Sequence, residues 1–159
     1  MELSPAQKVT LKAAIAAETT PAFVTLRQVG DEQGMAEFYN TASTFTVWKS
    51  SVTITETGRV FNGAEWAGMT GANHTRLQTV AQYLSSYQPA LADIRAMFND
   101  IWSGAGGVLT RAALLLLWKR LATRGERIFA TGTGTDVVPG LLVLEGQVTA
   151  QNISDALRS

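Results

Sequence analysis

The chain has 159 residues, of which 46% are hydrophobic and 16% charged, and its 13 Lys and Arg balance its 13 Asp and Glu. The length fits one domain with a small appendage, and the balanced charge excludes a chain-wide electrostatic footprint for nucleic acid. The absence of cysteine excludes disulfides and thiolate metal sites. Because charged residues average about 25% of soluble domains, the surface is poor in charge, which favours a subunit covered by partners.

No targeting or membrane segment is expected. The N-terminus lacks a basic run followed by an apolar stretch, so the sequence predicts no signal peptide. The longest apolar run, Ala112–Trp118, has seven residues, whereas roughly 20 are needed to span a bilayer. We therefore expect a soluble protein, made inside a cell, with no membrane contact.

Helix signals recur along the first half of the chain. The segment 4–17 opens with Ser-Pro and a glutamine three residues after the serine, an N-cap with a capping-box partner. A Thr-Pro start closed by glycine predicts a second helix over 20–30, and an aspartate cap predicts a third over 31–39. The segment 44–50 is irregular or extended, and 72–85 carries an apolar stripe at helical spacing.

The strongest helix signal follows Pro89. Apolar side chains fall there at helical spacings and form a complete face, made by Ile94, Met97, Phe98, Ile101 and Trp102. After a glycine-rich break, the next helix contains Leu114–Trp118, which is apolar nearly all round. Such a helix is usually buried on most sides, so we expect it at the centre of the fold. Thr123 and Glu126 form a further capping box.

From residue 131 the pattern changes from helical to extended. Glycines recur through this segment, while Val137-Val138 and residues 141–148 are typical of strand. The sequence therefore predicts a mainly α protein: a compact multi-helix domain over 1–130 and a glycine-tethered, extended β arm over 131–159, with a possible short terminal helical turn. Such an arm could pair with a neighbouring subunit or fold back on its own helices, and the sequence leaves both open.

Little in the sequence points to catalysis. His74 is the single histidine, which excludes a His/Cys metal site and weakens any triad. Carboxylate pairs such as Asp93 with Asp100, or Glu56 with Glu65, could in principle hydrolyse glycosides. The first pair flanks an apolar stripe and is typical of the solvated edge of a helix. We expect no enzymatic activity and no cofactor or metal.

One segment is strongly basic. Five of the 13 basic residues lie within seventeen positions, namely Arg111, Lys119, Arg120, Arg124 and Arg127. Three interpretations remain open: helix capping and solvation, ion pairing between subunits, or contact with nucleic-acid phosphates. These five side chains are our first candidates for partner binding.

The remaining partner-binding candidates are apolar. Tryptophan is enriched at binding hot spots, and Trp48 lies in the irregular segment, so it is the tryptophan most able to reach an interface. In the predicted arm, the aliphatic run Leu141, Leu142, Val143 and Leu144 could pair with a neighbouring chain.

Two stretches carry a resemblance to a known group of proteins: ADIRAMFNDIWSGAG at 92–106 and LATRGERIFATGTG at 121–134. Together they resemble a family of small structural proteins of tailed bacteriophages and prophages. Segments 3–12 and 47–52 are similar as well, and the match is weakest around 54–72. The resemblance implies a virion protein assembled in the host cytoplasm, and it transfers no catalytic residue.

Helical subunits with an extended arm also resemble head–tail connector (neck) proteins, which form rings on the portal and exchange terminal segments. The leading hypothesis is therefore a ring-forming connector subunit whose partners are copies of itself and portal, neck or tail proteins. The alternatives are a tail or capsid-surface protein, a small nucleic-acid-binding module that uses segment 111–127, and, with least support, a hydrolase.

Overall fold

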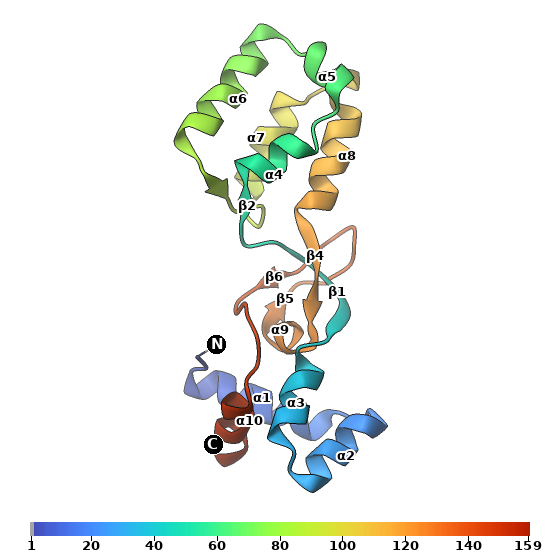
Figure 1. Ribbon diagram of the computed structural model, residues 1–159, viewed down its shortest axis with the longest axis vertical. Coiled ribbons are helices and arrows are strands. Elements are labelled where there is room, and N and C mark those ends of the chain that lie inside the picture. The colour runs from blue at the N-terminus through green and yellow to red at the C-terminus, as the bar shows by residue number, and fades with distance from the viewer. Residues whose placement is uncertain (1) are drawn as a thin grey trace. The chain divides into compact units, whose positions relative to one another are not determined.

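Helices dominate residues 2–159, the part of the chain that the computed structural model describes (Figure 1). The predicted mainly α class is confirmed. The chain divides into two compact units: unit 1 combines the segment up to Val47 with Leu121–Ser159, and unit 2 is Trp48–Arg120. This division differs from the predicted domain 1–130 with arm 131–159, because the two ends of the chain pack together.

Unit 1 is built on helices that begin where the sequence places their caps. The Ser4 hydroxyl accepts the Gln7 N–H, and Gly30 ends the second helix in the left-handed region with φ 72°. The core surrounds Phe23, whose ring lies 4.7 Å from that of Phe38 and 5.2 Å from that of Tyr39. The helices of unit 1 are α1 (Pro5–Ala17), α2 (Pro21–Val29), α3 (Glu32–Tyr39), α9 (Arg124–Phe129) and α10 (Ala150–Arg158).

The strands form short pairs. β1 (Ala42–Trp48) pairs with β4 (Lys119–Thr123), so of the segment 44–50, predicted as irregular or extended, residues 44–48 are strand and 49–50 are irregular. β5 (Ala130–Thr131) pairs antiparallel with β6 (Leu141–Leu142), so the segment after residue 131 turns back on unit 1.

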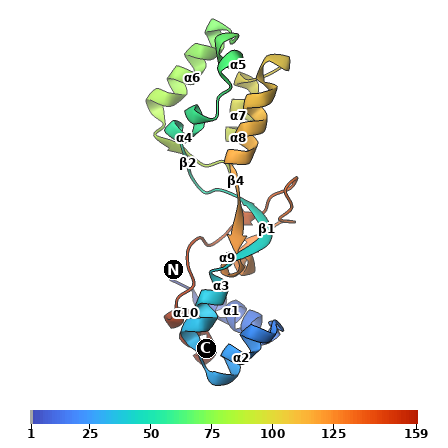
Figure 2. The ribbon, with the colours of Figure 1, turned by 45° about the vertical axis from the view of Figure 1, so that its right-hand side comes forward.

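The predicted C-terminal arm is wrong as an independent element. The segment ends in α10, whose side chains Ile153 and Ala156 are completely buried, and α10 packs against α1 and α3 in both ribbon views (Figure 1 and Figure 2). The Asn40 side chain exchanges two hydrogen bonds of 2.8 Å with the backbone of Val148 and holds the approach to this helix. Because α10 completes the core of unit 1, the chain folds back on itself, which was the second alternative.

A glycine-lined loop lies between β5 and β6, over residues 132–140. The Phe45 ring packs against it so closely that a Cβ at Gly134 or Gly140 would lie 2.1 or 2.4 Å from ring atoms. The Thr46 N–H donates to the Gly134 carbonyl at 2.7 Å, and the Gly140 N–H donates to the Thr46 carbonyl at 2.8 Å. The loop is therefore pinned to β1.

Unit 2 has its own core. Trp102, Trp118, Phe98 and Leu114 are each at most 2% exposed. The Tyr87 hydroxyl is hydrogen-bonded to Thr57 at 2.6 Å and accepts the Trp118 indole N–H at 2.8 Å. The elements are β2 (Val52–Thr53), α4 (Ile54–Arg59), α5 (Gly63–Ala67), α6 (Gly71–Tyr83), β3 (Ser86–Tyr87), α7 (Ala92–Ile101), the 3-10 turn η1 (Ala105–Gly107) and α8 (Val108–Leu117).

α7 and α8 lie side by side and are joined by η1 (Figure 1 and Figure 2). A Cβ at Gly107 would lie 2.0 Å from the Trp102 carbonyl oxygen, so the tight turn between these helices requires glycine at this position. Within residues 2–159, none of the helices has the length and apolarity needed to cross a membrane.

The packing of α10 gives the first testable prediction. Ile153 is completely buried and Leu157, on the same helix, is 39% exposed. We expect Ile153→Ala to lower the free energy of unfolding of unit 1 by about 2–4 kcal/mol, because it removes core packing and leaves a cavity. Leu157→Ala is the matched control, with an expected change below about 1 kcal/mol. Urea unfolding of the full chain measures both, and equal effects would contradict the placement of α10 in the core.

Candidate protein interface

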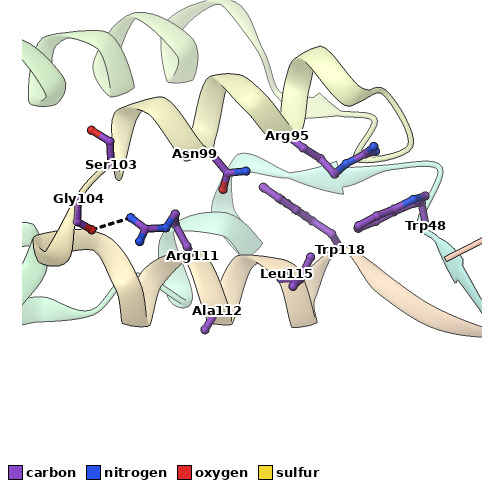
Figure 3. Close-up of a pocket in the computed structure, with 9 residues that line it drawn as sticks. All are labelled: Trp48, Arg95, Asn99, Ser103, Gly104, Arg111, Ala112, Leu115 and Trp118. Carbon is purple, nitrogen blue, oxygen red and sulfur yellow. Dashed lines mark hydrogen bonds between the residues drawn. The ribbon is translucent and has the colours of Figure 1, made fainter. Parts of the chain in front are cut away.

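An open groove of about 530 Å³ runs between α7 and α8 (Figure 3). Its lining combines aromatic, aliphatic and cationic side chains, and none of the lining residues is acidic. The residues that line it are Trp48, Arg95, Asn99, Ser103, Gly104, Arg111, Ala112, Leu115 and Trp118.

Arg111 fixes one end of the groove. Its Nη1 donates to the Trp102 carbonyl and, at 2.9 Å, to the Gly104 carbonyl, as the dashed line in Figure 3 shows. These carbonyls come at the end of α7, where the last helical C=O groups lack partners within the helix. Arg111 thus ties α8 to the end of α7 through the backbone, with its charge retained at the groove.

Arg95 and Trp48 form the other end. The Arg95 guanidinium carbon lies 4.2 Å from the centroid of the Trp48 ring, an attractive cation–π geometry. Its Nη1 donates to the carbonyls of Pro89 and Ala90. Burial lowers the pKa of Arg95, with the Asp93 carboxylate acting in the opposite direction, and the guanidinium remains charged at neutral pH. The arginine is therefore held in place by its own chain.

A polar stripe connects the two ends. Arg95 and Asn99 lie one turn apart on the same side of α7, and Ser103 follows at the same four-residue spacing just past the C-cap of the helix. Asn99 and Ser103 are exposed, and their side chains form no hydrogen bond with other described residues. The apolar face of this helix was predicted, whereas the stripe was missed; its four-residue spacing is the feature that could have revealed it.

The outer face of α8 is apolar and exposed. We use the name α8 outer face for Val108, Leu109, Ala112, Leu115 and Leu116, whose spacing places them together on one side of the helix. Leu109 is 60% exposed and Leu116 71%, whereas Leu114 on the opposite side is completely buried. The expectation that this helix is buried on most sides is therefore wrong for the chain alone. Unit 2 supplies packing partners for one face of α8, and the other contacts solvent.

The five cations of the basic segment are distributed over three elements: Arg111 on α8, Lys119 and Arg120 on β4, and Arg124 and Arg127 on α9. α8 ends at Leu117, so Lys119 and Arg120 are strand residues rather than cations in the last turn of a helix. Both Lys119 and Arg120 interact with other residues of the chain.

Arg124 and Arg127 lie against aromatic rings of unit 1. The Arg124 guanidinium is 4.5 Å from the Phe38 ring centroid and its Nε donates to the Thr41 hydroxyl at 3.1 Å, while Arg127 is 6.0 Å from the ring of Phe45. Both line two shallow hollows of unit 1. They remain candidates for partner contact, and the basic segment does not form one continuous helical face.

The aliphatic run of the predicted arm alternates in exposure. Leu141 is 46% and Val143 64% exposed, whereas Leu142 and Leu144 are half-buried and Leu144 packs against the core of unit 1. In the loop that precedes these residues, the Val137 side chain is 89% exposed. Besides the α8 outer face on unit 2, the chain therefore has a second exposed apolar surface, formed on unit 1 by Val137, Leu141 and Val143.

The carboxylates weighed for catalysis have identifiable structural contacts. Glu56 accepts the Thr53 N–H and hydroxyl at 2.8 Å in the capping box of α4, and these hydrogen bonds hold the pKa of Glu56 below its usual value. Glu65 accepts the N–H groups of Leu109 and Thr110 at 2.8 Å and so caps the start of α8. Over residues 2–159, no group of His, Asp and Glu side chains is arranged to hold a metal ion.

Comparison of this chain with models of protein families, with curated proteins and with solved structures found no match. The features of the chain that bear on its function are therefore the α7–α8 groove, the α8 outer face and the two sequence stretches that carry the resemblance.

The two faces of α8 should respond differently to truncation. Leu114→Ala is expected to lower the free energy of unfolding by about 2–4 kcal/mol, because the side chain is completely buried. Leu116→Ala, two positions away, should change it by less than about 0.5 kcal/mol, because most of that side chain contacts solvent. Urea unfolding at low protein concentration provides the measurement. A large loss for Leu116→Ala would show that the α8 outer face is covered within the isolated chain.

Proposed function

We propose that this chain is a non-enzymatic structural subunit of a tailed-bacteriophage particle, a head–tail connector (neck) protein that assembles into a ring. The outer face of α8, rather than an extended C-terminal arm, is the surface through which it assembles. The observation that carries this proposal is the exposed aliphatic stripe of α8 beside a groove lined by Trp48 and two arginines.

Burial of the α8 outer face by a partner is favourable in free energy. Complete burial of a leucine side chain contributes about 1.5–3 kcal/mol, and Leu109, Leu115 and Leu116 are each at least 43% exposed. Contiguous apolar surface beside an anchored tryptophan and arginine is the composition of protein–protein hot spots. The low charged fraction of the chain, 16%, agrees with a surface that is largely covered in the assembled state.

The assignment to a phage particle is supported by the resemblance of 92–106 and 121–134 to structural proteins of tailed phages. The first stretch contains α7 and the turn that Arg111 anchors, so the resembling residues include one wall of the groove. A structural role also fits the acidic side chains, because Glu56 and Glu65 cap helices.

A position in the tail or on the capsid surface is the alternative placement, and it would use the same surface. Mass spectrometry of separated heads and tails distinguishes the two: a connector stays with heads that carry the portal, whereas a tail protein is found with purified tails. Recovery of the chain only outside the particle would contradict a structural role in either position.

Assembly tests the role of the α8 outer face. We expect Leu116→Glu to prevent incorporation into particles without unfolding the chain, because a carboxylate buried at an interface is strongly disfavoured. Val29→Glu on α2 is the matched control, since Val29 is 72% exposed and Leu116 71%. Particle yield and the content of each variant in purified particles are the measurements. Normal incorporation of the Leu116→Glu chain would contradict the proposed interface.

A further inference from the structure

The chain as a whole has no net formal charge, but its charges are distributed unequally between the two units. Unit 2 contains seven Lys and Arg against four Asp and Glu, whereas unit 1 contains six against nine. Counted from these four residue types, the formal net charge of unit 2 is +3 and that of unit 1 is −3. Two copies of such a chain attract each other when unit 1 of one faces unit 2 of the other.

The most exposed apolar loop lies on the acidic unit. Residues 128–157 include three Asp and Glu and no Lys, Arg or His. Within them, Val137 is 89%, Val138 55% and Val143 64% exposed. The loop is held by Phe45 and by the two backbone hydrogen bonds of Thr46, so little conformational entropy remains to be lost on binding.

The α7–α8 groove has the complementary chemistry on the basic unit. Arg95 and Arg111 each use Nη1 for backbone carbonyls, and their Nε and Nη2 groups form no hydrogen bond with other described residues. With Asn99 and Ser103 they provide donors along a groove whose lining contains no carboxylate. Ala112 and Leu115 make the groove continuous with the α8 outer face.

We propose that the α7–α8 groove and α8 outer face of one copy bind segment 135–145 of a neighbouring copy, which comprises the second half of the glycine-lined loop, β6 and the three residues after it. This inference rests on the proposed function, because it identifies the surface that α8 meets in the assembly. Joining two different surfaces makes the contact heterologous, so that successive copies close into a ring or extend as a filament. The proposed ring corresponds to the case in which this heterologous contact closes.

The occupant is a protein segment rather than nucleic acid. The groove is walled by Trp48, Trp118 and Leu115, and a phosphate backbone would leave the adjoining α8 leucines uncovered. Nucleic-acid sites without base readout combine many cations that track phosphates, whereas this groove has two, both pinned to backbone carbonyls. A loop with exposed valines, carried by a unit of net charge −3, is complementary to the apolar lining and to the positive charge of the groove.

A mixing experiment tests this arrangement with the full-length chain. Leu116→Glu disrupts the receiving surface and keeps the loop intact, while Val137→Glu disrupts the loop and keeps the receiving surface intact. A heterologous contact predicts that each variant alone is monomeric and that an equimolar mixture forms a 1:1 dimer that cannot grow. Light scattering coupled to size-exclusion chromatography, over a series of concentrations, measures these masses, and Val29→Glu is the control expected to assemble as the wild type does.

The outcomes separate this inference from the proposed function. If Val137→Glu assembles like the wild type while Leu116→Glu does not, the loop inference is overturned and the role of α8 stands. If both variants stay monomeric in the mixture, the two surfaces do not bind each other and the inference is also overturned. A wild-type chain that remains monomeric at about millimolar concentration, far above a micromolar Kd, overturns self-association, and the particle content of the chain still tests the structural role.

Two matched variants test the contribution of charge complementarity to this contact. Asn99→Asp and Gln82→Glu each add one negative charge to unit 2, at exposed positions in the groove and on α6 respectively. We expect Asn99→Asp to weaken association roughly 2- to 10-fold and Gln82→Glu to have a smaller effect, with the difference reduced by salt. Equal effects would contradict docking of an acidic segment at the groove.

Discussion

A helix that is apolar on nearly every side requires packing partners around most of its circumference, and unit 2 provides them for one face of α8. Leu114 and Trp118 are buried in the core of unit 2. The opposite side, with Leu116 at 71% exposure, contacts solvent in the isolated chain. The fold of unit 2 is thus complete while the burial of α8 is incomplete. The proposed assembly follows from this unequal packing of α8.

The two surfaces proposed to bind each other, at α8 and at the glycine-lined loop, are both held rigidly by the rest of the chain. Gly107 allows the turn before α8 to approach Trp102 closely, and Arg111 fastens that turn by hydrogen bonds to backbone carbonyls. Phe45 and the backbone of Thr46 similarly hold the glycine-lined loop of unit 1. Groups fixed before association lose less conformational entropy when they bind. Apolar side chains held exposed to water are unfavourable in a free monomer, whereas in a subunit they are ready to be buried by a partner.

Local features of this fold were predictable from sequence, and non-local ones were not. The caps at Ser4 and Thr123 were identified because a capping box involves residues three positions apart, and the structure has them. The burial of α10 depends on contacts such as those between Asn40 and Val148, which are 108 positions apart. No periodicity indicates such a contact, so the same residues resembled a free arm. Likewise, the apolar run of α8 was identified, but which of its faces has a partner depends on the packing of the rest of unit 2.

The proposed assembly requires the α8 outer face to be exposed in the isolated chain and covered in the assembled particle. Hydroxyl-radical footprinting measures this directly, because side-chain oxidation depends on solvent access. We predict that Leu115 and Leu116 are oxidised readily in the dilute chain and protected in purified particles, whereas the buried Leu114 is protected in both. Equal oxidation of Leu116 in the free chain and in the particle would contradict the account.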